Sequence, residues 1–149
     1  MTSMKKALWQ RTHMSIRPAA ALLYTSVSAG VVAFQIALAA GIPWGAYAMG
    51  GAFPGQFPPA LRIAALVQAV LYAGMAVVVM VQAGLIRTGW SRVSRWLIWI
   101  VVAFAALSLV LNLITPSAGE RVIWAPVALT LLISSAVVAI KGSSRRLTP

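Results

Sequence analysis

The side chains that could support chemistry in this sequence are few, and most of them are amides. Gln35, Gln68 and Asn112 each interrupt a long apolar run. An amide buried in a membrane either binds a polar group of a ligand or joins neighbouring helices. The sequence has one acidic residue, Glu120, and one histidine, His13. This set can hold a small polar group, but it lacks the paired carboxylates and the triads of hydrolytic enzymes.

Metal and cofactor chemistry is also poorly supported. The sequence has no cysteine, which excludes disulfides and thiolate metal sites. A single histidine cannot supply both axial ligands of a haem, and no glycine-rich phosphate loop with its lysine is found. Proton-coupled transport normally uses a titratable group inside the membrane, and none lies at the centre of an apolar run. We therefore predict a non-enzymatic protein with no catalytic residues, no metal and no cofactor.

The composition places the chain among membrane proteins. Of its 149 residues, 61% are hydrophobic and 9% are charged, and the mean hydropathy is +0.91. Soluble domains carry about 25% charged residues. The net charge of +11 comes from basic residues in short segments between apolar runs. This placement indicates anionic lipid headgroups as the partner, and not nucleic acid.

The apolar runs predict an all-α bundle of four transmembrane helices in a single domain. Pro18 suits the first turn of the first helix. Ser117 and Glu120 form an S-x-x-E capping box, which predicts that the fourth helix begins at Ala118 and contains Pro126. The predicted spans are residues 18–41, 60–86, 93–115 and 118–141.

The first apolar run has a competing interpretation as a cleaved signal peptide. Ala37-Leu38-Ala39 fits the small-residue cleavage pattern. The run is longer than the usual apolar region of about 7–15 residues, which favours a retained helix.

Small residues predict how the first two helices pack against each other. Four-residue spacing lets two backbones approach closely. A separate face of the first helix carries Tyr24, Ser28 and Gln35. The two expected ridges are Ala29, Ala33, Ala37 and Gly41 in the first helix, and Ala65, Ala69 and Ala73 in the second.

The basic residues predict the orientation. Of the twelve, four lie in residues 1–17, three in 87–95 and three from Lys141 onward, whereas Arg62 and Arg121 lie beside the opposite loops. The positive-inside rule therefore places both termini in the cytoplasm. Abundant arginine, alanine and glycine suggest a bacterial genome, and hence the inner membrane.

The most unusual stretch is residues 42–60, with four prolines, four glycines, four aromatic residues and no charge. The orientation places this loop outside, and helix depth places the three amides in the outer half beneath it. The bland interpretation is that the amides join helices, that the aromatics anchor at the interface, and that Glu120 caps a helix and pairs with the nearby arginines. The residues predicted to bind a ligand are Gln35, Trp44, Tyr47, Arg62, Gln68, Asn112, Glu120 and Arg121.

Part of this pattern resembles small bacterial four-helix membrane proteins of uncharacterised function. The resemblance begins at Gly41-Ile42-Pro43-Trp44-Gly45 and continues through Gly50-Gly51, Pro58-Pro59 and Arg62, and would cover most of the chain, including Asn112 and Glu120-Arg121. It implies a fold and a membrane location, and no activity.

Two functions are compatible with these observations. The first is a non-enzymatic membrane protein that binds a small apolar ligand, a lipid or a partner protein at its outer mouth. The second is a small oligomeric channel or facilitator, because one four-helix chain is too thin to enclose a wide pore. A homo-oligomer or a membrane partner is compatible with either function.

Overall fold

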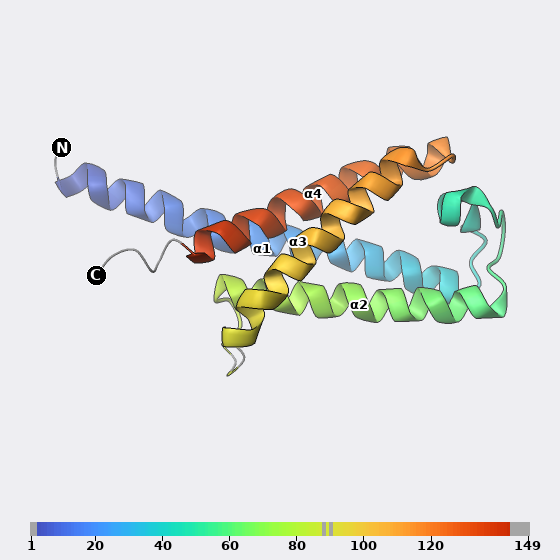
Figure 1. Cartoon of the computed structure of the whole chain (residues 1–149), viewed down its shortest axis with the longest axis horizontal. Helices are drawn as coiled ribbons and strands as arrows, with labels where there is room; N and C mark the ends of the chain where they lie inside the picture. Colours follow the sequence, from blue (N-terminus) through green and yellow to red (C-terminus); the bar gives the residue numbers. More distant parts are fainter. Residues whose placement is uncertain (1–2, 88, 90, 144–149) are drawn as a thin grey trace.

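The computed structural model describes residues 3–87, 89 and 91–143. This part of the chain is helical apart from its connections (Figure 1). The helices are α1 (Ser3–Ala39), α2 (Pro59–Ala83), α3 (Ser91–Ile114) and α4 (Ala118–Ser143), with two short 3₁₀ turns, η1 (Gly45–Tyr47) and η2 (Met49–Gly51), between α1 and α2.

Each of the four helices is long and apolar enough to cross a membrane. The shortest apolar segment has 22 residues, which is about 33 Å of helix and slightly more than the hydrocarbon core of a bilayer. The prediction of an all-α protein with four candidate spans is therefore confirmed. The segments are Ile16–Ala39, Pro59–Ala83, Val93–Ile114 and Ala118–Ile140.

Helix α1 begins well before the predicted start. We expected Pro18 in the first turn, but α1 runs from Ser3 and contains Pro18 in its interior. This expectation was wrong because a proline removes one backbone hydrogen bond and does not by itself end a helix. The start of α4 at Ala118 and the position of Pro126 inside it are as predicted.

The helices form two antiparallel hairpins. In Figure 1, α1 and α2 run side by side, and α3 and α4 form a second pair that crosses them. At the right of the figure the two hairpins diverge, and the turns η1 and η2 lie between their ends. We call this the loop end, and we call residues 40–58 the α1–α2 loop. The opposite end, where α2 ends and α3 begins, is the basic end.

The face that α1 buries differs from the predicted alanine ridge. Ala29 and Ala33 are exposed, whereas Tyr24, Ser28 and Leu38 are almost completely buried. Burying a large side chain removes more apolar surface than burying an alanine, so the face with Tyr24 and Leu38 packs inward. The expected ridge on α1 was therefore wrong for Ala29 and Ala33, whereas Ala37 is half-buried and Gly41 is buried. On α2 the prediction holds for Ala65 and Ala69 but not for Ala73, which is exposed.

The α1–α2 loop is folded back on itself. The backbone N–H of Gly45 donates to the carbonyl of Gly55 at 2.9 Å. Phe57 is buried against Leu38 and Ala65, which attaches the second half of the loop to both helices. These contacts hold the loop close to the bundle instead of extended along the membrane surface.

Gln82 connects three helices at the basic end. Its backbone carbonyl accepts a hydrogen bond from the Arg17 guanidinium of α1. Its side-chain Oε1 accepts a second from the hydroxyl of Ser94 in α3, at 3.2 Å. These bonds hold the two hairpins together at this end, away from the cavity described next.

Candidate functional site

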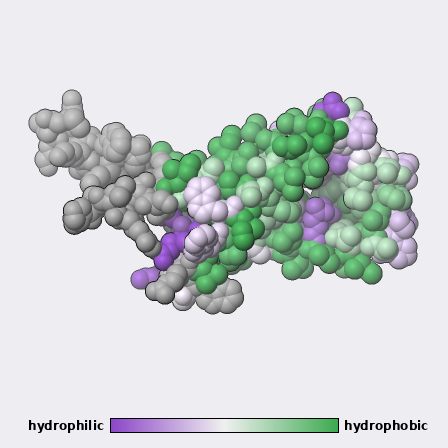
Figure 2. Space-filling view, viewed as in Figure 1, coloured by the Kyte–Doolittle hydropathy of each residue, from purple (hydrophilic) through white to green (hydrophobic). Residues whose placement is uncertain are grey.

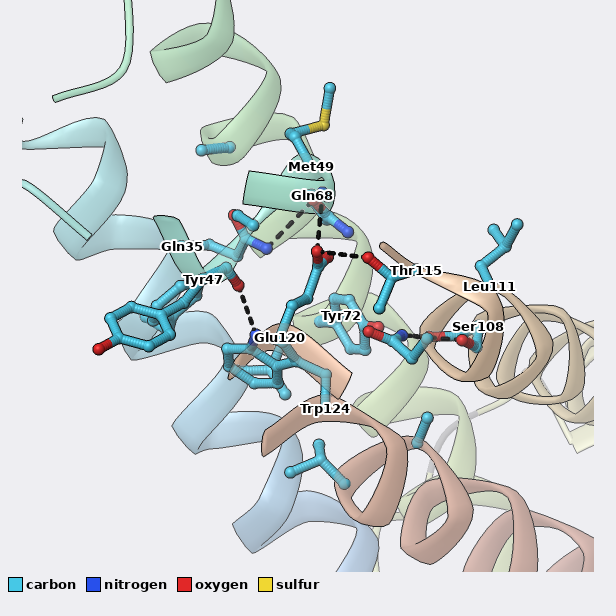
Figure 3. Close-up of a pocket in the computed structure, with 18 of the residues that line it drawn as sticks. Gln35, Tyr47, Met49, Gln68, Tyr72, Ser108, Leu111, Thr115, Glu120 and Trp124 are labelled. Atoms are coloured by element: carbon cyan, nitrogen blue, oxygen red, sulfur yellow. Dashed lines mark hydrogen bonds between the residues drawn. The ribbon is translucent and has the colours of Figure 1, made fainter. Parts of the chain in front are cut away.

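A cavity of about 590 Å³ lies at the loop end, between the diverging hairpins (Figure 3). All four helices and the α1–α2 loop line it, and most of its wall is apolar. Its polar side chains are Gln35, Tyr47, Gln68, Tyr72, Ser108, Asn112, Thr115 and Glu120. A concave, mainly apolar cavity with a few polar groups is the usual form of a small-molecule site.

The amides of Gln35 and Gln68 form a pair across α1 and α2. The Gln35 Nε2 donates to the Gln68 Oε1 at 3.1 Å (Figure 3). This bond joins the two helices, as the bland interpretation expected, and both residues also line the cavity. Neither the Gln35 Oε1 nor the Gln68 Nε2 has a hydrogen-bond partner among the described residues. The pair therefore retains one acceptor and one donor.

Asn112 does not join this amide pair. Its Nδ2 donates to the backbone carbonyl of Ser108 at 2.8 Å and lies 3.4 Å from the Ser108 hydroxyl. Both partners belong to its own helix, so Asn112 contributes to the cavity wall and not to helix association. Its Oδ1 accepts no hydrogen bond within the part of the chain that the structure describes.

Glu120 attaches the α1–α2 loop to the turn between α3 and α4. Its Oε2 accepts hydrogen bonds from the backbone N–H of Gly50 at 2.7 Å and from the Thr115 hydroxyl at 2.8 Å (Figure 3). Its own N–H donates to the Ser117 hydroxyl at 3.2 Å, which confirms the Ser117 half of the predicted capping box. The other half is wrong, because the Glu120 carboxylate bonds to Gly50 and Thr115 and not to the N–H of Ser117. We call the contact of Glu120 with Gly50 and Thr115 the Glu120 latch.

The expected pairing of Glu120 with arginine is wrong. Neither Arg62 nor Arg121 forms an ion pair with its carboxylate in the described structure. The backbone at Gly50 and Gly51 has φ angles of +70° and +75°. This turn directs the Gly50 N–H at the Glu120 carboxylate, whereas the Gly51 N–H donates to the carbonyl of Ala48 at 3.0 Å. Gly50 therefore supplies a donor to Glu120, and the arginines bond elsewhere.

Arg62 and Arg121 bond to backbone carbonyls near the end of the α1–α2 loop and beyond the end of α3, and neither lines the cavity. Arg62 Nε donates to the carbonyl of Phe57 at 2.8 Å, and its guanidinium packs against Gly41, so it joins both ends of the loop. Arg121 donates to the carbonyl of Thr115 at 2.6 Å, just beyond the end of α3. A cation there is favoured by the negative end of the helix dipole.

The aromatic residues of the loop divide between the cavity and its outside. Tyr47 lines the cavity, and its carbonyl accepts a hydrogen bond from the Trp124 indole at 2.7 Å (Figure 3). Trp44 lies outside and stacks on Phe34 at 6.0 Å between ring centroids. Phe34 also contacts Trp124 edge-on at 4.6 Å. Phe34 and Trp124 also line the cavity. Among the aromatic residues, however, only Trp44 and Tyr47 were predicted to bind a ligand.

Tyr72 and Ser108 are cavity residues that the predicted set omitted. Tyr72 lies one turn after Gln68 on α2, and Ser108 one turn before Asn112 on α3. The Tyr72 hydroxyl interacts with the Ser108 side chain, and its ring contacts Phe104 edge-on at 5.8 Å. Four-residue spacing from the two amides was the signal that could have found both residues.

The cavity opens sideways between α2 and α3. Gln68 of α2 and Leu107 and Leu111 of α3 line it and are exposed. Figure 2 shows a hydrophilic patch in the gap between two hydrophobic walls toward the loop end. Gln68 is the tenth residue of α2, about 14 Å from its start at 1.5 Å per residue. A polar side chain is therefore accessible on a face that would otherwise contact lipid.

Comparison with known protein families, with curated proteins and with solved structures gives no match. Within residues 3–87, 89 and 91–143, no three His, Cys, Asp or Glu residues lie close enough to hold a metal ion.

Proposed function

We propose that this chain is a non-enzymatic integral membrane protein that binds a small amphipathic molecule in the cavity at its loop end. The observation that carries the proposal is the sideways opening, which exposes Gln68 between α2 and α3. The ligand reaches the site from within the bilayer, through this opening. Its apolar body lies against the leucine and phenylalanine side chains, and its polar group lies near the amides.

The cost of an exposed amide supports this assignment. A polar group without a hydrogen-bond partner in hydrocarbon costs several kcal/mol, on the order of 2–7 kcal/mol. The Gln68 Nε2 has no partner among the described residues, and the side chain is exposed. A bound molecule with a hydrogen-bond acceptor removes this cost, and an apolar lipid chain does not.

Replacing Gln68 with leucine is expected to weaken ligand binding about tenfold, the equivalent of one hydrogen bond of about 1.4 kcal/mol. The ligand is first identified in two ways. Amphipathic amines, alcohols and carboxylates are screened for a shift in the unfolding temperature, and native mass spectrometry detects lipids that remain bound to the protein purified from membranes. Val70→Leu, on the exposed face of α2, is the matched control and should bind normally. A wild-type protein that shifts with no compound and carries no lipid contradicts the proposal.

We further propose the bacterial inner membrane as the location, with both termini in the cytoplasm and the loop end outside. The asymmetry of the basic residues supports this orientation. Lys5, Lys6, Arg11 and Arg17 lie at one end of α1 and no basic residue lies at its other end. Cytoplasmic basic segments favour contact with anionic lipid headgroups.

Reporter fusions test the orientation directly. A periplasmic alkaline phosphatase domain inserted after Gly50 should be active, and the same domain at the C-terminus should be inactive. A fluorescent protein that folds only in the cytoplasm should give the opposite result at both positions. Fluorescence from position 50 contradicts the orientation.

An oligomeric channel or facilitator is the second candidate. The observation that favours it is again Gln68, because an exposed polar side chain on α2 could line a path between several copies. Flux of small solutes into liposomes, together with the oligomeric state in detergent, separates the two functions. A monomer that conducts nothing removes the channel, whereas flux without ligand binding removes the binding protein.

A further inference from the structure

The charge inside the cavity indicates which kind of ligand it binds. Glu120 is the only charged side chain in the cavity wall, as far as the structure describes the chain. It is half-buried, and no Lys or Arg of the described chain forms an ion pair with it. A carboxylate beside an apolar cavity attracts a cation strongly, because the local dielectric constant is lower than that of water.

The two nearest arginines do not compensate this charge by direct contact. Arg62 bonds to the carbonyl of Phe57 and the side chain of Gln56, and Arg121 bonds to the carbonyl of Thr115. Neither of them lines the cavity. The Oε2 atom of Glu120 accepts bonds from Gly50 and Thr115, which are both neutral donors. No hydrogen bond to its Oε1 occurs among the described residues, so this atom is available to a ligand.

Aromatic residues also line the cavity. Phe34, Tyr47 and Trp124 line it, and Trp124 lies one turn after Glu120 on α4. The faces of aromatic rings attract cations by about 0.5–2 kcal/mol. The Gln35 Oε1 and the Asn112 Oδ1 add two carbonyl acceptors in the wall. An ammonium group would find a carboxylate, aromatic faces and acceptors, whereas an anion would meet an uncompensated negative charge.

We infer that the ligand is an amphipathic organic cation, with a protonated amine on an apolar body. Its amine lies at Glu120, an acceptor atom that the ligand also carries bonds to the Gln68 Nε2, and its apolar body lies along the opening between α2 and α3. This inference rests on the proposed function and names the class of molecule that the same cavity binds.

Three matched compounds test the inference on the full-length protein in nanodiscs of zwitterionic lipid: 4-phenylbutylamine, 4-phenylbutanol and 5-phenylpentanoate. At pH 7 they are a cation, a neutral molecule and an anion with the same apolar body. We expect the amine to bind at least about tenfold more tightly than the alcohol, and the carboxylate to bind most weakly. Zwitterionic lipid avoids general attraction of the amine to an anionic surface.

Glu120→Gln provides the second arm, because glutamine keeps a side-chain oxygen for Gly50 and Thr115 but carries no charge. It should reduce amine binding about tenfold and change alcohol binding by less than about threefold. An alcohol that binds as tightly as the amine, or an unchanged affinity of Glu120→Gln for the amine, overturns the inference and leaves the proposed function standing. If none of the three compounds binds, the inference is overturned, and the proposed function fails as well only if the wider screen gives no shift and the protein carries no lipid. The comparison of the three compounds on the wild-type protein is decisive even if the variant is unstable.

Discussion

Replacing Gly45 with alanine is expected to detach the α1–α2 loop from the bundle. A Cβ at this position would lie 2.1 Å from the carbonyl oxygen of Phe53 and 2.8 Å from that of Gly55. Both contacts are with backbone atoms, which cannot move without breaking the hydrogen bond from Gly45 to Gly55. We expect a loss of about 3 kcal/mol in the free energy of unfolding, at the upper end of the range for overpacked sites.

The measurement is thermal unfolding in detergent, combined with limited chymotrypsin digestion. The detached loop should be cut after Trp44 and Tyr47 much faster than in the wild type, whereas Phe53 and Phe57 precede prolines and are not cut. Gly74→Ala is the matched control, because no atom outside its own helix lies within 4 Å of the added Cβ. It should be neutral or stabilising by about 0.5–1 kcal/mol. Equal digestion rates for the two variants would show that the loop does not have the described conformation.

Glu120→Ala is expected to have an effect of similar size. It breaks the Glu120 latch and leaves the Gly50 N–H without its acceptor. Hydrogen bonds to a charged group contribute about 1.5–3 kcal/mol each, and partial exposure reduces this. We expect a loss of about 2–4 kcal/mol in the free energy of unfolding, faster digestion of the loop, and weaker ligand binding.

Two further substitutions separate the parts of the latch. Thr115→Val removes one of its two donors and should cost about 1 kcal/mol. Glu120→Gln keeps an acceptor for both donors and should also cost about 1 kcal/mol. Thermal unfolding and chymotrypsin digestion are measured for Glu120→Ala, Thr115→Val and Glu120→Gln, as for Gly45→Ala. The latch is refuted if the alanine variant unfolds at the wild-type temperature.

The four helices could be predicted because each depends on a local pattern. Apolar runs of 22 to 25 residues are visible without knowledge of their neighbours. The start of α4 was equally local, because the Ser117 hydroxyl accepts a hydrogen bond from the backbone N–H of Glu120, three residues later. The early start of α1 is not visible in the same way, because a proline such as Pro18 fits the first turn of a helix as well as the interior position that it occupies.

The cavity could be predicted only in part, because it depends on contacts between distant residues. Depth along a helix was sufficient to bring Gln35 and Gln68 together. It could not show that Arg62 and Arg121 bond to nearby carbonyls, which are features of the folded backbone. The acceptor role of Glu120 toward Gly50 was equally hidden, since that N–H becomes available only once the turn has formed.

The sequence of α1 alone also does not show which of its faces packs inward. Spacing of alanines shows where two helices can approach closely, but the same helix carries a second periodic face with Tyr24 and Leu38. Which face is buried depends on the partner helices, and the larger side chains gain more from burial.

The Glu120 latch also has a consequence for how the protein assembles during synthesis. Gly50, Ala46 and Tyr47 bond to residues 70 to 77 positions later in the chain. The first hairpin can therefore enter the membrane before the partners of its loop have been synthesised. Because helices insert first and associate afterwards, the roof of the cavity closes only when the second hairpin arrives. A ribosome-bound chain that ends before residue 115 should therefore have two inserted helices and a loop that proteases can cut.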